Sequence, residues 1–315
     1  MAIPVIIDCD PGIDDVMALL LAFVRPELDV RLITTEAGNQ TQDKTSFNAR
    51  GFADLMKQKI EVARGLEQPL MRTLEVAGHV HGDTGLGSLT LDEPVTKESR
   101  RSAIDALRET ILESPEETVL VATGPLTNIG ALFLAHPEVK AHIRYISFMG
   151  GAAVGGNVTP TAEFNVYTDP EAADLVFRSG VPIVMSGLDV THKAYMTEQD
   201  LQAIEAIGTP LAREIIAMLK FYGKAAQQTP FHEPHFADVI RLHDLCAVAY
   251  AIKPELFAGM DCHVEIETEG RLTSGTTVVD YTNRTKKPAN AHVLHSVDRE
   301  AFVRLFTDAV REAGG

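Results

Sequence analysis

Short apolar runs alternate with longer amphipathic segments from residue 3 to residue 190 of the chain. The short runs are rich in β-branched residues, as buried strands are, and they occupy residues 4–8, 29–38, 60–65, 118–122, 145–151 and 181–189. The segments between them have helical periodicity and occupy residues 14–24, 42–58, 126–137 and 168–180. This alternation predicts an α/β fold, with a mostly parallel central sheet and helices on both faces.

The last third of the chain departs from the alternation. Residues 195–255 have a helical pattern, and residues 297–312 predict a closing helix. Between them, residues 261–270 and 271–280 predict two strands, as a hairpin or an edge addition to the sheet. No Pro/Gly/Ser-rich linker or repeat divides the 315 residues, so we expect one domain over residues 1–315.

Composition excludes several classes of partner. The formal net charge of -16 disfavours nucleic-acid binding, which needs a basic surface. The longest apolar run, "VMALLLAFV", is too short to span a bilayer.

Cys9, Cys246 and Cys262 form no paired motif, which favours reduced thiols. Because the N-terminus also has no basic signal region, we expect a cytoplasmic location.

Polar residues follow the predicted strands. In open parallel sheets, ligands bind beyond the carboxyl ends of the strands. The residues that stand at those ends are Asp10, Asp14, Asp15, Asn39, Thr123, Asn157, Glu163, Asn165, Asp189 and His192. The sequence therefore predicts a polar site at one edge of the sheet.

The first of these positions carries an unusual concentration of charge. Asp8, Asp10, Asp14 and Asp15 fall within eight positions, between an apolar strand and an apolar helix. Acids in the first turn favour a helix, which accounts for one or two of them. Close carboxylates repel one another and lose solvation when buried. A bound cation would remove both costs, so we favour a metal site over helix capping.

The ligand types narrow the choice of metal. Carboxylate oxygens favour Mg²⁺ or Ca²⁺, but the spacing is not that of an EF-hand, because Gly12 and Ile13 interrupt it. Zinc would need nitrogen or sulfur ligands. "HVH" at residues 79–81 and "HEPH" at residues 232–235 offer histidines, but neither is the H-E-x-x-H motif. We regard zinc as the less favoured alternative.

A second acidic position lies at His243 and Asp244, where an apolar helical pattern begins. Asp244 could cap that helix, with His243 as a loop residue. Alternatively, if this helix starts at the same edge of the sheet, Asp244 would be a further metal ligand. His243 would then be a general acid beside the metal. The residues alone leave both possibilities open.

Seven motifs occur in the same order as in a known family. Together they resemble the calcium-dependent nucleoside hydrolases of the inosine-uridine preferring type, and they are "DCDPGIDD", "TTEAGNQT", "AGHVHGDTGLG", "ATGPLTNIG", "MGG…GNVTPTAEFNVYTDPEAA", "GLDVTH" and "HDLCAVAY". The resemblance implies an N-glycosidase that hydrolyses ribonucleosides to ribose and free base. It also implies a homotetramer or a homodimer.

The resemblance also implies roles for individual residues. The Ca²⁺ ligands would be Asp10, Asp15, Asp244 and the carbonyl of Thr123. Residues that would bind the ribose hydroxyls or lie along the sugar are Asp14, Asn39, Met149, Asn157, Glu163 and Asn165. His81 and His243 would lie near the base. Asp8 would support the loop through hydrogen bonds.

Cleavage of an N-glycosidic bond develops positive charge on the ribose. Carboxylate and amide oxygens around the sugar would stabilise that charge. Ca²⁺ acidifies water only weakly, so a carboxylate must take the proton of the attacking water, and Asp10 is the candidate. His243 is the candidate acid for the departing base.

Three features bear on the acid, on substrate access and on base preference. Leu245 stands where family members often have Pro after the His-Asp pair, which could shift the His243 loop. The glycine-rich segment 78–87 could close over the substrate. Base preference should depend on the segment from residue 222 to residue 235, where possible contacts are Tyr222, Gln227, Gln228, Phe231 and His232. A pyrimidine-specific (uridine/cytidine) hydrolase is therefore the main alternative to a mixed purine and pyrimidine enzyme.

Two further protein classes are remote alternatives. Haloacid-dehalogenase-like phosphatases also begin with a strand and Asp-x-Asp, but that motif usually continues with Thr or Val, whereas Pro11 and Gly12 follow here. A non-catalytic nucleoside-binding protein would usually have an export signal and two lobes. The sequence indicates neither.

Overall fold

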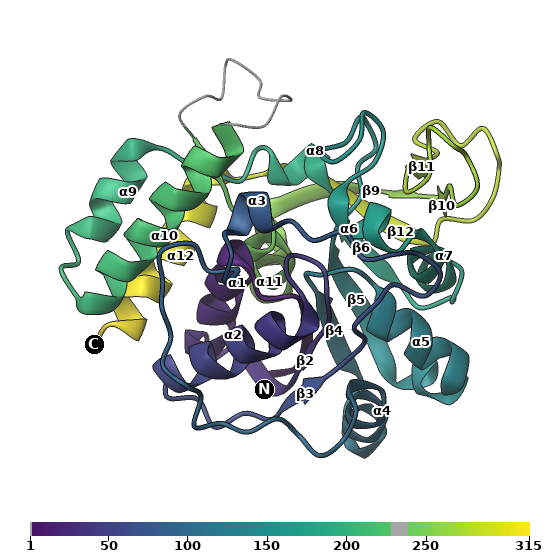
Figure 1. The fold of residues 1–315 in the computed structure, drawn as a ribbon. Helices are drawn as coiled ribbons and strands as arrows, with labels where there is room; N and C mark the ends of the chain where they lie inside the picture. Colours follow the sequence, from purple (N-terminus) through teal and green to yellow (C-terminus); the bar gives the residue numbers. More distant parts are fainter. Residues whose placement is uncertain (1, 228–238) are drawn as a thin grey trace.

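A computed structural model describes residues 2–227 and 239–315. For residues 225–227 it describes only the backbone. Within these ranges, eight strands form one central sheet in the order β3-β2-β1-β4-β5-β6-β12-β9 (Figure 1). All neighbouring pairs are parallel except β12 and β9. The strands are β1 (Ile3–Cys9), β2 (Leu28–Thr35), β3 (Val62–Arg64), β4 (Thr118–Ala122), β5 (Ile143–Met149), β6 (Ile183–Ser186), β9 (Phe257–Cys262) and β12 (Ala291–Val297).

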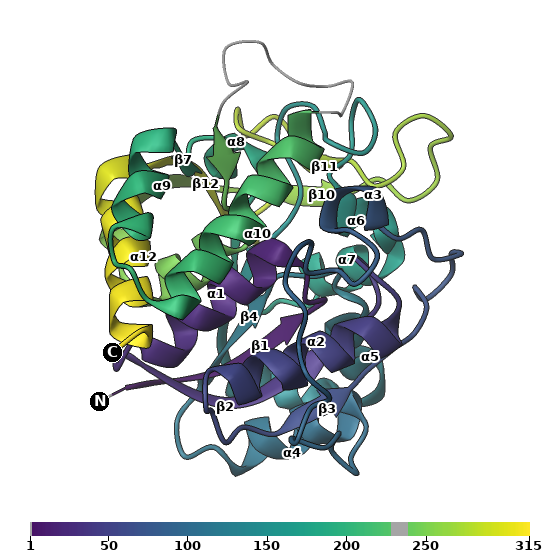
Figure 2. The same cartoon turned by 60° about the vertical axis from the view of Figure 1, so that its left-hand side comes forward.

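Helices cover both faces of the sheet, as Figures 1 and 2 show. One face carries α1 (Ile13–Val24), α2 (Gln42–Leu55), α11 (Leu245–Ile252) and α12 (Arg299–Ala313). The other carries α4 (Ala103–Glu113), α5 (Thr127–Ala135) and α7 (Pro170–Phe177). Along β1, Val5 and Ile7 belong to the first core and Ile6 to the second. The predicted fold is confirmed, and the reason is this burial of alternate side chains on both faces.

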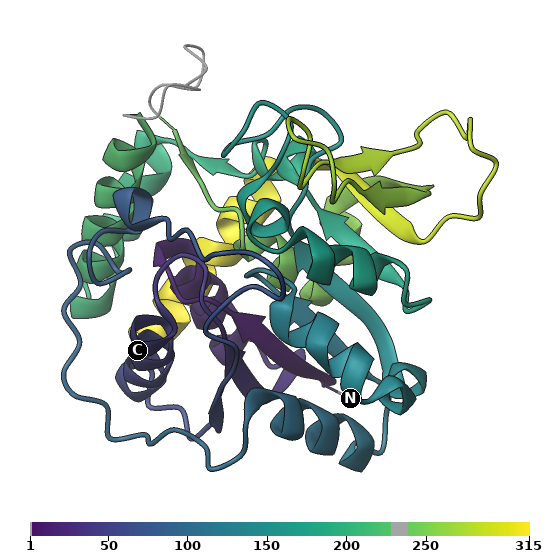
Figure 3. The same cartoon turned by 45° about the vertical axis from the view of Figure 1, so that its right-hand side comes forward.

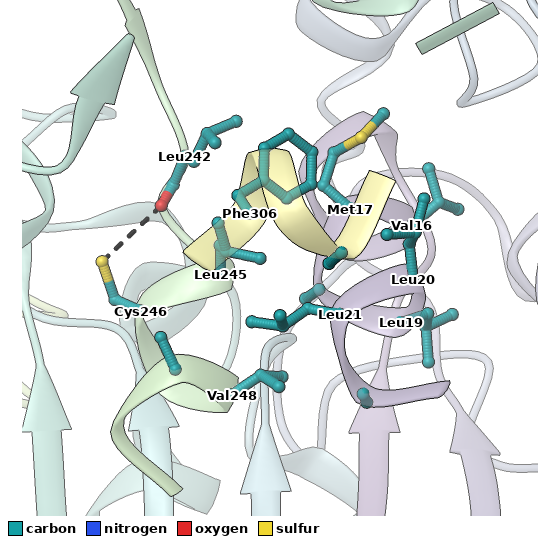
Figure 4. Packing of buried hydrophobic residues seen from close by; sticks show 14 of the residues in the cluster. Val16, Met17, Leu19, Leu20, Leu21, Leu242, Leu245, Cys246, Val248 and Phe306 are labelled. Atoms are coloured by element: carbon teal, nitrogen blue, oxygen red, sulfur yellow. Dashed lines mark hydrogen bonds between the residues drawn. The ribbon is translucent and has the colours of Figure 1, made fainter. Parts of the chain in front are cut away.

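Helix α1 is buried almost all round. Leu19, Leu20 and Leu21 are consecutive, yet each is fully buried, because α1 packs against the sheet, against α11 and against α12 (Figure 4). Each fully buried leucine stabilises the fold by about 1.5–3 kcal/mol relative to an exposed one. This packing holds the loop between β1 and α1 in place.

Short elements lie beyond the carboxyl ends of the strands. They include α3 (Gly78–His81), α6 (Phe164–Thr168) and α8 (Leu188–Thr191), which lie in the upper half of Figure 1. Asp169 caps α7 through the amide of Ala172, with Pro170 in the first turn. The remaining elements are η1 (Pro137–His142), β7 (Tyr195–Met196), α9 (Glu198–Glu205), α10 (Pro210–Gln227), β8 (Ile240–Arg241) and η3 (Pro254–Leu256).

The C-terminal third differs in detail from the prediction. The small hairpin is present, as β10 (Val264–Ile266) paired antiparallel with β11 (Thr277–Val279), and it projects from the body in Figure 3. The chain just before it forms the edge strand β9 of the central sheet. Strand β12 and helix α4 were not predicted, and β2 ends at Thr35, three residues before the predicted end. In the ranges that the structure describes, no helix combines the length and apolarity needed to cross a membrane.

Candidate active site

Three carboxylates meet where two helices begin. Asp14 and Asp15 lie in the first turn of α1, and Asp244 directly precedes α11. One oxygen from each lies within 4.8 Å of the others, and all three residues are buried. Asp244 stands at the N-cap of α11, but its side chain accepts no capping hydrogen bond from that helix. The alternative that Asp244 is simply a helix cap is therefore wrong, because its carboxylate points to the other acids.

Asp10 lies beside this cluster, held by the loop after β2. Its Oδ2 accepts a hydrogen bond of 2.6 Å from the Asn39 amide, and the Asn39 side chain donates to Asp15 Oδ2 at 2.9 Å. The Thr123 hydroxyl donates to the other oxygen of Asp15 at 2.8 Å. Asp10 Oδ1 is buried and has no hydrogen-bond partner among the described residues. This oxygen is therefore available to a ligand.

The electrostatics of the four acids suit a cation. Burial raises the pKa of Asp14 to about 7, and burial raises the pKa of Asp10 and of Asp244 well above the usual range. The neighbouring carboxylates raise these pKa values further. A hard divalent cation fits this oxygen donor set, because it would offset both the repulsion and the lost solvation.

A cavity of about 810 Å³ opens above the acids. Nearly every residue predicted to bind substrate or metal lines it, namely Asp14, Asn39, His81, Thr123, Met149, Asn157, Glu163, Asn165, His243 and Asp244. Asp10 and Asp15 are buried and are not among the residues that line it. Asp189, which follows β6, instead accepts a hydrogen bond from the Ala153 amide at 2.7 Å, so it supports a loop.

The wall after β5 is a network of polar groups. Glu163 caps α6 and accepts hydrogen bonds from the amides of Asn165 and Gly151, at 2.9 and 2.8 Å. Burial raises its pKa to about 7. The Asn165 side chain donates to the carbonyls of Thr123 and Met149, at 2.8 and 3.0 Å. Asn157 is exposed at the rim, where its side chain accepts from the Phe164 amide.

Two histidines from different segments of the chain line the cavity. His81 Nδ1 accepts a hydrogen bond of 3.1 Å from the Ile13 amide, so its hydrogen must be on Nε2. Burial lowers the pKa of His81 to about 3. The ring packs against Tyr222 with centroids 5.5 Å apart. The second histidine, His243, has its Nδ1 2.8 Å from the Thr191 hydroxyl.

Asp8 has a supporting place, as predicted. Its Oδ1 accepts hydrogen bonds from Thr34 and Asn128, at 2.5 and 2.9 Å. Its backbone carbonyl accepts from the Thr123 amide at 2.9 Å. Asp8 therefore connects β1 to the segments that carry Thr123 and Asn39. Burial raises the pKa of Asp8 to about 6.

Sequence reasoning missed Glu36 and Arg241. Tyr222, named as a possible base contact, lines the cavity, and its hydroxyl donates to Asp14 Oδ2 at 3.1 Å. Glu36 is buried next to Asp8, and the Asn128 amide donates to it. Its position directly after β2 was the available signal. Arg241 lines the cavity, as does His192, which the sequence analysis placed at the carboxyl edge of the sheet.

The histidines considered as zinc ligands do not join the acid cluster, and several possible base contacts lie outside the described residues. His79 lines the cavity, but the acid cluster found in the described ranges contains no histidine, which does not support the zinc alternative. Gln228, Phe231, His232 and His235 lie outside the described residues, as does the side chain of Gln227.

Comparison with known proteins agrees with this geometry. Residues 5–304 match the family model described as inosine-uridine preferring nucleoside hydrolase. The chain is 45% identical to the pyrimidine-specific ribonucleoside hydrolase RihA of Salmonella arizonae, with 100% of both chains covered. It is 46% identical to RihA of Shewanella sp. strain ANA-3, over 98% of this chain and 96% of that one.

Solved structures give the same result. The purine-preferring ribonucleoside hydrolase from Gardnerella vaginalis superposes with a TM-score of 0.91 at 32% identity, covering 99% of both chains. A plant nucleoside hydrolase superposes with a TM-score of 0.90 at 32% identity, over 98% of this chain and 99% of that one. The chain therefore belongs to the inosine-uridine preferring nucleoside hydrolase family, and it is an N-glycosidase that hydrolyses ribonucleosides to ribose and free base.

Proposed function

We propose that this enzyme is a calcium-dependent hydrolase that prefers pyrimidine ribonucleosides, uridine and cytidine. The observation that carries the base preference is the similarity to relatives named pyrimidine-specific, at 44–46% identity over essentially the whole chain. The purine-preferring hydrolase from Gardnerella vaginalis is more distant, at 32% identity. A mixed purine and pyrimidine specificity is the alternative.

The acids divide between the cation and the sugar in this proposal. Asp10, Asp15, Asp244 and the Thr123 carbonyl would hold Ca²⁺. When bound, the cation orients the ribose hydroxyls and a water molecule and offsets the charge of the acids. The partner-free oxygen of Asp10 and the convergence of Asp15 with Asp244 support this set.

The sugar would lie between the acids and the wall after β5. Asp14, Asn39, Asn157, Glu163 and Asn165 present oxygens and amides to the cavity, which suits ribose hydroxyls. Met149 would lie along the ring. As the glycosidic bond breaks, positive charge develops on the ribose, and the carboxylates of the floor stabilise it.

Two groups would move protons. Asp10 would accept a proton from the attacking water, because one of its oxygens is held by the Asn39 amide while the other has no partner in the described ranges. His243 would donate a proton to the departing base. A positioned acid contributes roughly 10²–10⁴-fold to the rate. His81, with its hydrogen on Nε2, would donate a hydrogen bond to an oxygen or nitrogen of the base.

Three further properties belong to the proposal. We place the activity in one domain over residues 1–315, because β12 and β9 near the C-terminus complete the sheet that begins with β1. We also propose a cytoplasmic location, which three buried free cysteines support. The assembly would be a homotetramer or a homodimer.

A substrate panel tests the proposal. The kcat/KM of uridine, cytidine, inosine and adenosine would be measured with excess Ca²⁺ and with a chelator. We expect the two pyrimidine nucleosides to exceed both purines by tenfold or more, and we expect the chelator to abolish turnover. Equal values for inosine and uridine would contradict the base preference. Full activity after metal removal would contradict the calcium site.

A further inference from the structure

Thr191 is a buried residue of α8 that contacts the candidate acid. Its hydroxyl lies 2.8 Å from His243 Nδ1, although the two residues are 52 positions apart in the sequence. The ring of His192 packs against the same histidine, with centroids 5.9 Å apart and planes at 69°. His243 is therefore held by two neighbours, one through a hydrogen bond and one through ring packing.

The backbone around His243 is fixed separately from its ring. Strands β7 and β8 pair Tyr195 with Arg241 and Met196 with Ile240. The ladder continues through a hydrogen bond of 3.1 Å from the Leu242 amide to the Ala194 carbonyl. The main chain thus carries His243 to the cavity but does not set the orientation of its imidazole. The side-chain contacts with Thr191 and His192 limit rotation of the ring.

We propose that Thr191 is a positioning residue for the hydrolysis. It holds Nδ1 of His243 against α8, so that Nε2, on the opposite edge of the ring, faces the cavity where the base departs. The inference rests on the proposed role of His243 as the leaving-group acid. A hydroxyl both donates and accepts hydrogen bonds, so the contact holds for either tautomer of the ring.

The position of Thr191 makes its effect separable from substrate binding. Thr191 is buried behind the cavity and is not among the residues that line it. Removing its hydroxyl should therefore leave substrate contacts in place while the His243 ring loses its orientation. We expect kcat to fall with little change in KM, and only for substrates whose leaving group needs a proton.

The test compares Thr191→Val with the wild-type enzyme on uridine and on p-nitrophenyl riboside, whose leaving group needs no acid. We expect Thr191→Val to lower kcat on uridine by about tenfold or more, up to the roughly 10²–10⁴-fold that a positioned acid contributes. The p-nitrophenyl riboside should be hydrolysed at nearly the wild-type rate. Thr191→Ser retains the hydroxyl and should restore most of the uridine activity.

A matched control separates orientation from loss of a buried hydroxyl. Thr118 is fully buried, and its hydroxyl has no hydrogen-bond partner in the described part of the chain. Thr118→Val should leave both activities unchanged. Wild-type kcat in Thr191→Val, equal losses on both substrates, or no recovery in Thr191→Ser would each overturn the proposal.

Side-chain ¹⁵N spectra test the contact independently of the reaction. The His243 Nδ1 resonance should shift in Thr191→Val and return in Thr191→Ser, and an unchanged resonance would refute the positioning role. If the wild-type enzyme releases no ribose from uridine, the proposed function fails by itself. The ¹⁵N result then still decides whether Thr191 orients the ring.

Discussion

Removal of the proposed cation should make the stability of this protein depend on pH in an unusual direction. Asp14, Asp10 and Asp244 are buried together, and burial raises their pKa values in the folded chain. The folded chain therefore binds more protons than the unfolded chain above the ordinary pKa of an aspartate. Stability contributed by such groups is present at low pH and is lost as the pH rises through the folded pKa.

The magnitude follows from Asp14, whose pKa rises from 3.8 to about 7. Between about pH 8 and about pH 6, a single carboxyl with that shift stabilises the folded state by about 1.4 kcal/mol. For a chain of 315 residues, that corresponds to a rise in Tm of roughly 2 °C. The metal-free protein should therefore melt at a higher temperature at the lower pH.

Calcium should stabilise the protein more at the higher pH. A cation at about 100 times its Kd stabilises the folded protein by about 2.7 kcal/mol, and it binds best when the carboxyls carry no protons. The gain in Tm from Ca²⁺ should therefore be larger at about pH 8 than at about pH 6. Scanning calorimetry with and without a chelator measures both effects.

A pair of variants checks that the acid cluster is responsible. Asp244→Asn should reduce the gain in Tm from Ca²⁺, whereas Asp92→Asn, at an exposed position, should leave it unchanged. A metal-free Tm that falls between pH 8 and pH 6, or a calcium effect that is equal at both pH values, would refute the reasoning.

Three other predictions concern single residues. Asp10→Ala should lower kcat on uridine by several orders of magnitude, with a circular dichroism spectrum like that of the wild type; near-normal kcat would remove Asp10 as the base. Gly12→Ala should destabilise the fold by about 1–3 kcal/mol and raise KM, because a Cβ there would lie 2.4 Å from His81 Nδ1 and 2.8 Å from Asn39 Nδ2; urea unfolding and kinetics measure both. Tyr222→Phe removes the donor to Asp14 and should weaken ribonucleoside binding by roughly tenfold, the equivalent of about 1.4 kcal/mol; an unchanged KM would show that the hydroxyl is dispensable.

Much of the fold can be predicted from local patterns in the sequence. The run of β1 is apolar on both faces, and Ile6 and Ile7 are buried in different cores, so composition alone predicts a central strand. Helix α7 begins at Asp169 and Pro170 as its sequence predicts. Strand β12 was missed because His292 and His295 interrupt its apolar residues, and its pairing with β6 depends on a partner more than 100 positions earlier.

Some features of the site are also visible in the sequence, and others depend on the tertiary structure. The crowding of Asp10, Asp14 and Asp15 after β1 is visible in the sequence, and so is the chemistry that it favours. The sequence could not show that Asp244 joins Asp14 and Asp15, because that contact depends on α11 packing against α1. It also gave Asp244 two possible roles, and only its burial and its lack of capping bonds decide between them.

The sequence by itself determined that this is an α/β protein with acids and amides at the carboxyl edge of a parallel sheet. The alternation of strands and helices and the spacing of motifs are local properties, so they can be read from the sequence. The tertiary structure alone decided which side chains meet across the site, as Tyr222 meets Asp14 and Thr191 meets His243. Contacts of this kind depend on strand order and helix packing, which bring together residues that are distant in the chain, and no local pattern encodes them.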